Sequence, residues 1–506
     1  MESTYKELKQ RLAEIVDLRV VARLASWDQH VMMPPRGAAA RAEQLATLGK
    51  VAHERFISDE IGRLLDALRP YEEKQPYDSD EAALIRITRR DWEKERRVPT
   101  DLSAEITRSG AVAYQAWVQA RRDSDFAAFL PYLRRNVELK RRYVECFEPT
   151  DELYDVLLDD FEPGMKTAEA RAVLDDLRRE LVPFIRDLAD GAEAVDDSCL
   201  YGDFPLGDQE AFGRMVLEGF GFNSESWRMD PTVHPFASAT CPTDVRITTR
   251  YFPDRYESLF SMMHEFGHGL YEHQVSASLD RTPLQRGVSM SLHESQSRMW
   301  ENLVGRGLPF WRRYYPELRS QFSRLEDVEL DEFYRAVNKV QPSLIRVEAD
   351  EVTYNLHIIL RFELEQEIMA GQIALEELPE AWDARMEEYL GIDVPDAARG
   401  VLQDVHWSFG GFGYFPTYSL GNVVSVQIWE KLCEAIPDLD DQIEQAEFGA
   451  LRDWLRENLH SHGRKFLPRE MLERVVGGPM DAGPYIRYLK TKLGGIYGAA
   501  EAVASS

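Results

Sequence analysis

Apolar residues recur at intervals of three and four positions along most of the chain, a spacing that places them on one face of an α-helix. Between residues 5 and 25, this face consists of Leu8, Leu12, Ile15, Leu18 and Ala22. The same spacing predicts helices over residues 36–56, 80–97, 103–122, 167–188, 254–274, 289–304, 330–340, 345–370 and 377–390. Most prolines and glycines fall between these stretches, as helix-ending residues should.

One stretch has a different pattern. Residues 234–252 are rich in Thr, Val, Ile and Tyr, and polar and apolar positions alternate between 244 and 250. This alternation predicts a short strand or hairpin directly before the helix at 254–274. The expected fold class is therefore mainly α: a large two-lobed helical body around a deep active-site groove, with a small β-hairpin or short sheet beside that helix.

No tandem repeat, low-complexity tract or long polar linker interrupts the chain. Separate domains on tethers are therefore not expected, and residues 1–506 are predicted to form a single domain with two lobes. The N-terminal helices are expected to form part of the groove wall or a lid. They include Trp27, Asp28 and Gln29, for which packing is the simplest role.

Composition narrows the possible functions. The 506 residues are 44% apolar and 29% charged, as in ordinary globular proteins. A formal net charge of −28 argues against nucleic acid and anionic membranes as partners, because both would be repelled. No run of about eighteen apolar residues is present, and the N-terminus has no secretory pattern, so a cytoplasmic protein is expected. The four cysteines form no CxxC pair, which excludes a cysteine zinc site or a thioredoxin-type motif.

The predicted helix at 254–274 contains the sequence His264-Glu-Phe-Gly-His268. Two histidines four residues apart lie on one helical face, within reach of a single metal ion. Glu265 can then face a water molecule at that ion, as in zinc peptidases with this motif. Coincidence is the alternative for so short a motif, but chance matches tend to fall in loops or to lack a third ligand.

A catalytic zinc ion needs a third protein ligand and an open fourth position. Glu294 is the best candidate because it lies on the next predicted helix, about 26 residues after His268. Taken alone, Glu294 would more often be a solvated carboxylate on a helix surface. His293 points elsewhere on that helix and is interpreted as a packing or outer-sphere residue. A site with two histidines and one glutamate also accepts cobalt or manganese.

Several further motifs occur in a fixed order. They are Trp27-Asp-Gln29, Met33-Pro-Pro35, Ala40-Arg-Ala-Glu-Gln-Leu-Ala-Thr-Leu48, His234-Pro-Phe236, Asp244-Val-Arg-Ile-Thr248, His293-Glu-Ser-Gln296, Ile345-Arg-Val-Glu-Ala-Asp350 and Gly400-Val-Leu-Gln-Asp-Val-His-Trp407. Together with the HExxH sequence, they make the chain similar, over nearly its whole length, to the thermostable metallocarboxypeptidases of the carboxypeptidase Taq family.

This resemblance implies that His264, His268 and Glu294 bind one Zn²⁺ per subunit and that Glu265 is the general base. It also implies a mainly helical fold with two lobes around a long groove, similar to angiotensin-converting enzyme and neurolysin, and usually a homodimer. Members release single residues from the free C-terminus of peptides, with broad specificity and poor action on proline. Cobalt often substitutes for zinc in this family.

Further candidate residues lie between residues 403 and 422. His406, Tyr414 and Tyr418 are candidate donors to the oxyanion of the tetrahedral intermediate. They lie in a segment with glycines at 410, 411 and 413, which predicts a flexible aromatic loop beside the groove. The segment lacks the Lys-Ser of a phosphate-binding loop, which excludes nucleotide binding. Plain buried aromatic residues are the alternative for either tyrosine.

A carboxypeptidase needs a cation for the substrate's terminal carboxylate, and arginine suits this role. Arg346 is the first choice and Arg246 the second; the alternative is an ion pair of Arg346 with Asp350, or of Arg246 with Asp244. The strand near Asp244 is a candidate peptide-binding edge. His234 could contact the carbonyl next to the cleaved bond, or else be a buried structural histidine.

Three functions remain open at this point. The first is a carboxypeptidase acting on peptides with a free C-terminus. The second is an oligopeptidase or dipeptidyl carboxypeptidase, which would differ in how the far end of the groove is closed. The third is a peptide-binding protein without activity, which loss of Glu265 or of a ligand would favour. An aminopeptidase is disfavoured because no Gly-x-Met-Glu-Asn segment precedes the HExxH sequence.

Overall fold

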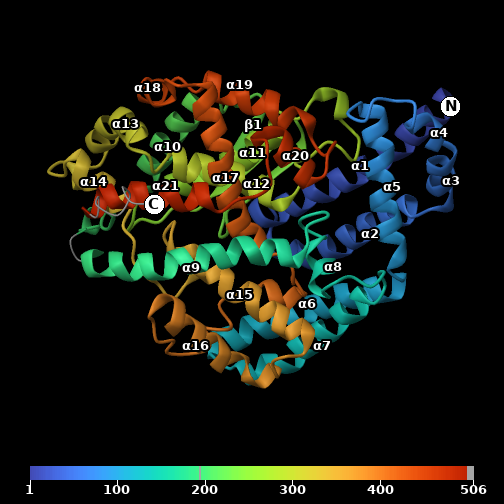
Figure 1. Ribbon diagram of the computed structural model, residues 1–506, viewed down its shortest axis with the longest axis horizontal. Helices are drawn as coiled ribbons and strands as arrows, with labels where there is room; N and C mark the ends of the chain where they lie inside the picture. The colour runs from blue at the N-terminus through green and yellow to red at the C-terminus, as the bar shows by residue number, and fades with distance from the viewer. Residues whose placement is uncertain (193–194, 499–506) are drawn as a thin grey trace.

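The computed structural model describes residues 1–192 and 195–498. These residues form a mainly helical body with one small sheet, which confirms the predicted fold class (Figure 1). The helices of the first half of the chain are α1 (Glu2–Val31), α2 (Ala38–Phe56), α3 (Asp59–Ala67), α4 (Arg69–Glu72), α5 (Asp80–Arg97), α6 (Thr100–Asp123), α7 (Phe126–Val144), α8 (Tyr154–Leu158), α9 (Thr167–Ala192) and α10 (Leu206–Phe220).

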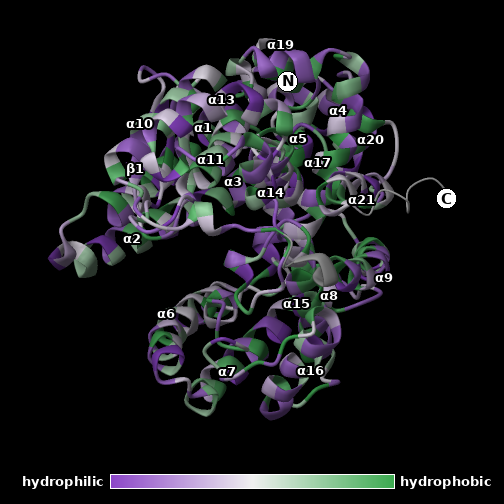
Figure 2. Cartoon of the chain, turned by 90° about the vertical axis from the view of Figure 1, so that its left-hand side faces the viewer, coloured by the Kyte–Doolittle hydropathy of each residue, from purple (hydrophilic) through white to green (hydrophobic). Residues whose placement is uncertain are grey.

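The second half of the chain contains the remaining helices and the helix that carries the HExxH sequence. They are α11 (Ser258–His273), α12 (Met290–Arg298), α13 (Leu308–Gln321), α14 (Leu330–Val337), α15 (Thr353–Ala370), α16 (Leu378–Leu390), α17 (Pro416–Ala435), α18 (Leu439–Glu444), α19 (Gly449–Asn458), α20 (Pro468–Val476) and α21 (Gly483–Tyr497). Figure 2 separates an upper group of helices, which includes α11 and α17, from a lower group with α6, α7, α15 and α16.

The sheet has three strands: β1 (Trp227–Pro231), β2 (Ala237–Cys241) and β3 (Asp244–Thr249). β3 lies in the centre, antiparallel to β2 and parallel to β1. The predicted hairpin is therefore confirmed as β2–β3. No alternation of polar and apolar positions predicts β1, which ends at Pro231 and lies at an edge of the sheet, where a proline removes no ladder hydrogen bond.

The sheet supports α11 through close contacts on one face. Val245 and Ile247 of β3 are fully buried against the helix. Gly269 of α11 faces Trp227, and a Cβ at this glycine would lie 2.4 Å from the indole ring. The small residue thus lets the helix approach the sheet closely, which fixes the height of the HExxH turn above it.

The N-terminal helices pack against the sheet as well. Trp27 of α1 is buried, and two guanidinium groups lie near its ring, that of Arg228 at 5.0 Å and that of Arg246 at 4.5 Å from the ring centre. Cation–π contacts of this kind favour association of the two elements. Helices α1, α2, α3 and α5 also share a small core of their own, which includes Leu12, Phe56 and Leu65.

Two helices have bounds that differ from the predicted ones: one begins later and the other ends earlier. The stretch 345–370 becomes helical only at Thr353, because the Asp350 carboxylate accepts hydrogen bonds from the backbone N–H groups of Val352 and Thr353 and so starts α15 there. Residues before it form a 3₁₀ turn, η6 (Arg346–Glu348). The stretch 289–304 leaves the α conformation after Arg298 and continues as a π-helical turn, η4 (Met299–Val304). No helix in the described part of the chain is long and apolar enough to cross a membrane.

Candidate metal centre and active site

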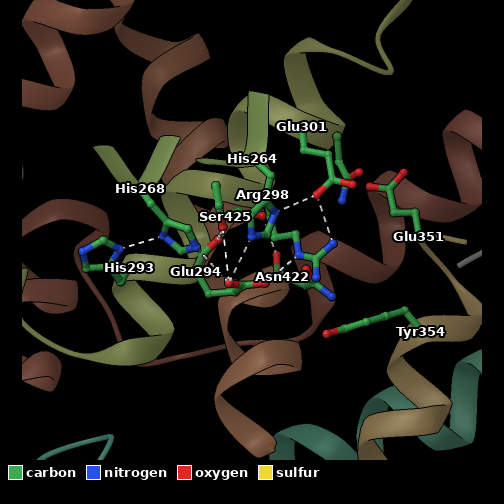
Figure 3. A network of polar contacts seen from close by, with 12 residues as sticks. His264, His268, His293, Glu294, Arg298, Glu301, Glu351, Tyr354, Asn422 and Ser425 are labelled. Atoms are coloured by element: carbon green, nitrogen blue, oxygen red, sulfur yellow. Dashed lines mark hydrogen bonds and ion pairs between the residues drawn. The ribbon is translucent and has the colours of Figure 1, made fainter. Parts of the chain in front are cut away.

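The two histidines of the HExxH sequence lie one turn apart on α11 with their ring centroids 4.9 Å from each other. Leu259, Met263, Phe266 and Leu270 of the same helix are buried in the main core. Burial of this face turns His264 and His268 towards α12, as Figure 3 shows. The helix therefore presents both imidazoles to the same small volume.

Glu294 of α12 completes this group. Its Oε2 atom lies 3.8 Å from Nε2 of His264 and 3.5 Å from Nε2 of His268, and the three ligand atoms all lie within 4.8 Å of one another. Ligand atoms at tetrahedral positions around zinc are about 3.4 Å apart. The separations therefore suit three ligands of one metal ion.

Two glycines allow these side chains to meet. Gly267, inside the HExxH sequence, faces the backbone of α12, and a Cβ there would lie 2.4 Å from the carbonyl oxygen of Gln296. Gly421 of α17 lies against Glu294 itself. A Cβ at Gly421 would lie 2.6 Å from both Cβ and Cγ of Glu294. α12 is thus held between α11 and α17 at distances that larger residues would prevent.

Hydrogen bonds to the Nδ1 atoms decide which nitrogen of each histidine is free. Nδ1 of His264 lies 2.9 Å from Oε2 of Glu301, so it carries the proton and Nε2 keeps its lone pair. His293 donates from Nε2 to Glu272 at 2.8 Å, and its Nδ1 therefore accepts a hydrogen bond from Nδ1 of His268 at 2.7 Å. Both Nε2 lone pairs consequently face Glu294, as metal ligation requires.

Arg298 and Glu301 extend the site along α12 and η4. The Arg298 guanidinium donates to Glu294 at 2.7 Å and to Glu301 at 3.1 Å. Burial would raise the pKa of Glu301, but Arg298 and His264 outweigh it and lower that pKa to about 2. Sequence reasoning missed both residues, although Glu294, Arg298 and Glu301 follow the i, i+4, i+7 spacing of one helical face. π-helical turns such as η4 are frequent at functional sites.

Glu265 is buried beside the ligands, and its carboxylate lacks a full set of hydrogen-bond partners among the described residues. Its Oε2 atom is buried and has no hydrogen-bond partner among the described residues. Burial raises the pKa of Glu265 to about 7, and the neighbouring carboxylates Glu294 and Glu301 add to this shift. An orphaned carboxylate oxygen next to three ligand atoms fits a proton acceptor for a water molecule held at a metal ion.

The first candidate for carboxylate binding, Arg346, has a different partner from the expected one. It is buried and donates from Nε and Nη2 to Asp404 at 3.0 and 2.9 Å, whereas Asp350 caps α15 instead. Arg361 of α15 also pairs with Asp404, at 2.6 Å through Nε. Two buried guanidinium groups therefore share one carboxylate, which leaves an excess positive charge in this cluster.

The three candidate oxyanion donors lie together next to Arg346. The ring of Tyr414 is 5.4 Å from His406 and 5.1 Å from Tyr418, and the Arg346 guanidinium lies 5.2 Å from the Tyr418 ring. Tyr354 connects this cluster to the metal ligands: its hydroxyl accepts from Arg346 at 3.0 Å, and Arg298 lies 4.6 Å over its ring. Tyr354 had no signal in the sequence, because its position matters only after α12 and α15 have both packed against α17.

The strand residues form a separate group. Arg246 makes a two-pronged ion pair with Asp244, at 2.9 and 3.0 Å, besides its contact with Trp27. In the ranges that the structure describes, no hydrogen bond or ion pair joins either residue to the metal ligands. His234 lies exposed in the connection between β1 and β2, so its interpretation as a buried structural histidine is wrong.

Comparisons with known proteins agree with this arrangement. Residues 7–493 match the family described as carboxypeptidase Taq (M32) metallopeptidase. The chain is 40% identical to thermostable carboxypeptidase 1 of Thermus thermophilus, over 98% of this chain and 99% of that protein. It is 34% identical to carboxypeptidase 1 of Bacillus subtilis, over 97% of this chain and 98% of the relative.

Solved structures give the same result. The M32 carboxypeptidase from Deinococcus radiodurans superimposes with a TM-score of 0.94 at 38% identity, covering 98% of this chain and 100% of that one. A metallocarboxypeptidase of Trypanosoma cruzi superimposes with a TM-score of 0.93 at 31% identity, covering 97% and 99%. With the match spanning almost all of its length, the chain belongs to the carboxypeptidase Taq (M32) family of metallopeptidases, and it is a peptide hydrolase.

Proposed function

We propose that this chain is a zinc-dependent carboxypeptidase that releases single residues from the free C-terminus of peptides, with broad specificity and poor action on proline. The observation that carries this proposal is the orphaned, buried Glu265 carboxylate next to the three converging atoms of His264, His268 and Glu294. Loss of Glu265 or of a ligand would have favoured a silent peptide-binding protein, and the chain retains all four residues.

Zinc suits this ligand set because two imidazole nitrogens and one carboxylate leave a fourth position open. Cobalt is expected to substitute, since it accepts the same ligands. When bound, the metal polarises the scissile carbonyl and brings the pKa of a water molecule towards neutrality. One ion per chain follows from the single candidate cluster in the described ranges.

Glu265 is the general base of the proposed reaction. Its unpartnered Oε2 atom accepts the proton of the attacking water and then delivers it to the leaving amine. Burial raises the pKa of Glu265 to about 7 in the metal-free chain. The charge of a bound metal ion lowers this pKa, which leaves the carboxylate ionised and able to accept the proton. The Glu265→Gln variant is therefore expected to keep its metal and lose activity; rates like those of the wild type would remove Glu265 from this role.

The oxyanion needs a hydrogen-bond donor besides the metal. His406, Tyr414 and Tyr418 remain the candidates, and their mutual contacts beside Arg346 support a common surface. Burial raises the pKa of Tyr414 to about 12, so its hydroxyl stays protonated and able to donate. The direct link from this surface to the ligands is Tyr354, which contacts both Arg346 and Arg298.

Arg346 is the better candidate for the substrate's terminal carboxylate. Two guanidinium groups share Asp404, so an anionic ligand would neutralise the excess charge. Arg246, by contrast, pairs one to one with Asp244, which leaves no excess positive charge there. Asp350 supports this region through its cap on α15. His234 is exposed in the connection between β1 and β2 and is free to contact an extended peptide.

An oligopeptidase or dipeptidyl carboxypeptidase is the alternative, and one experiment separates the three activities. Two peptides with acetylated N-termini, one with a free and one with an amidated C-terminus, are incubated with the protein and analysed by mass spectrometry. The proposal predicts stepwise loss of single residues from the free peptide only. Internal cleavage of both peptides would favour an oligopeptidase, and loss of residue pairs a dipeptidyl carboxypeptidase. A homodimer, proposed from the family resemblance, is tested by light scattering after size exclusion.

A further inference from the structure

Glu365 is a buried carboxylate of α15 that none of the proposed steps uses. Its side chain is fully buried and accepts three hydrogen bonds. The donors are the Tyr154 hydroxyl at 2.6 Å, the Trp407 indole N–H at 2.8 Å and the Gly413 backbone N–H at 2.9 Å. Two of these donors, Trp407 and Gly413, belong to the aromatic segment that carries His406, Tyr414 and Tyr418.

The chemistry of the donors requires both oxygens of a carboxylate. An indole N–H and a backbone N–H can only donate, so each must meet an acceptor. Oε1 accepts from Trp407, whereas Oε2 accepts from Gly413 and Tyr154. An amide side chain of the same shape would turn an NH₂ group towards one of these donors. Burying a carboxylate costs solvation free energy. Here the carboxylate accepts hydrogen bonds on both oxygens, which an amide cannot do.

The same helix also holds the start of this segment. Arg361 lies four residues before Glu365, one turn away on the same face of α15, and its guanidinium donates to Asp404 at 2.6 Å. Asp404 lies two residues before the 3₁₀ turn η8 (His406–Phe409), which contains Trp407. Two consecutive turns of α15 therefore fix the segment before and after His406.

The opposite side of the segment leaves little room for another position. Gly413 has a φ of +95°, and a Cβ there would lie 2.4 Å from the carbonyl oxygen of Leu157 in α8. Nδ2 of Asn136 in α7 donates to the carbonyl oxygens of Trp407 and Ser408 at 3.0 and 2.7 Å. The segment is thus held by contacts with α15, α7 and α8.

We propose that Glu365 is a positioning residue of the active site: it holds the 404–418 segment so that His406, Tyr414 and Tyr418 face the substrate. This rests on the proposed function for the role of those three side chains. The hydrogen bonds to Trp407 and Gly413 set the path of the backbone on both sides of the Gly410–Gly411 turn, where glycines alone would leave it free. Glu365 itself touches neither the substrate nor the metal ligands.

The test compares Glu365→Gln with Glu363→Gln, a matched change two residues away on the same helix. Glu363 pairs with Arg178 and Arg385 and bonds Tyr389, on the side of α15 that faces α9 and α16. Hydrogen–deuterium exchange of the 404–418 segment is measured first, without substrate. Loss of a hydrogen bond to the buried carboxylate, from Trp407 or from Gly413, is expected to speed exchange of backbone amides in the 404–418 segment roughly tenfold in Glu365→Gln only.

Kinetics with a C-terminally free peptide provide the second readout. Glu365→Gln is expected to lower kcat at least about tenfold with little change in KM and an unchanged content of bound metal. Tyr154→Phe removes one of the three donors to Glu365 and should lower kcat by a smaller factor. This variant tests the proposal if Glu365→Gln does not fold. Exchange like that of the wild type, or a kcat no lower than that of Glu363→Gln, would overturn the proposal. An inactive wild type would instead refute the proposed function, and the exchange result would still decide whether Glu365 fixes the segment.

Discussion

A Cβ atom on Gly421 of α17 would lie 2.6 Å from both Cβ and Cγ of Glu294, the third candidate metal ligand on α12. The absence of a side chain at one position thus determines where a carboxylate can lie at another. No pattern in the sequence connects the two residues, which are far apart in the chain and meet only where α12 and α17 pack together.

Gly421→Ala should therefore weaken metal binding. The added methyl group displaces Glu294 or separates the two helices, an overpacking that costs about 1–3 kcal/mol of stability. Metal affinity, measured by competition with a chromogenic chelator, is expected to fall at least about tenfold. Gly495→Ala is the control, because this glycine of α21 is exposed and a Cβ there meets nothing within 4 Å. Equal affinities in both variants would contradict the steric argument.

Glu301 should matter for metal binding although it is not a ligand. Glu301→Ala leaves Nδ1 of His264 without its acceptor and removes a carboxylate from Arg298. Loss of such an outer partner typically lowers metal affinity about 10- to 100-fold. The control is Glu317→Ala, which removes a carboxylate that pairs with Arg313 at the surface of α13. Isothermal titration with Zn²⁺ measures both; identical dissociation constants would exclude a role for Glu301.

The two candidate arginines make opposite predictions in kinetic measurements. Arg346→Gln is expected to raise KM for a C-terminally free peptide roughly 10- to 100-fold, because a charge-assisted interaction with the terminal carboxylate is lost. Arg246→Gln removes the partner of Asp244 and the contact with the Trp27 ring, neither of which involves the metal ligands, and should change KM little. Circular dichroism and metal content confirm that each variant is folded. The reverse order of effects would assign the carboxylate to Arg246.

Glu162 predicts a pH dependence of stability. Its buried carboxyl accepts hydrogen bonds from the Ser289 hydroxyl and the Ser291 N–H at the start of α12, yet burial raises its pKa from 4.5 to about 7. Between these two values the folded state retains a proton that the unfolded state has lost. The contribution of Glu162 to the free energy of unfolding therefore falls as pH rises from 4.5 to 7, by roughly 3 kcal/mol at most.

Glu162→Gln does not titrate, so it should gain stability relative to the wild type over this pH window. Urea unfolding of the metal-free proteins at pH 5 and pH 8 measures the difference between them. Because both proteins share all other titrating groups, those contributions cancel. Unfolding free energies that stay parallel from pH 5 to pH 8 would mean that the Glu162 pKa is not raised.

The sequence by itself determined the helical class, the hairpin at β2–β3 and the candidate ligands on α11 and α12. These features depend on local periodicity: helical spacing placed His264 and His268 on one face, and alternation marked β3. The ordered motifs also identified the family, which the comparisons confirm. The roles of Glu265 and of the ligands stay predictions until metal content and activity are measured.

Only the tertiary structure decided which distant residues share a site. Arg346 pairs with Asp404 rather than Asp350. The Asp350 carboxylate accepts hydrogen bonds from the first N–H groups of α15, and the helix begins only after it, so Arg346 and Asp350 do not share a helical face. Glu301, Tyr354 and Glu365 acquire their distant partners, on α11, α12 and the 404–418 segment respectively, only when these elements are packed in one core. Their contacts join residues tens to hundreds of positions apart, and no local pattern encodes such pairs. Packing at glycines and the satisfaction of buried polar atoms set them instead.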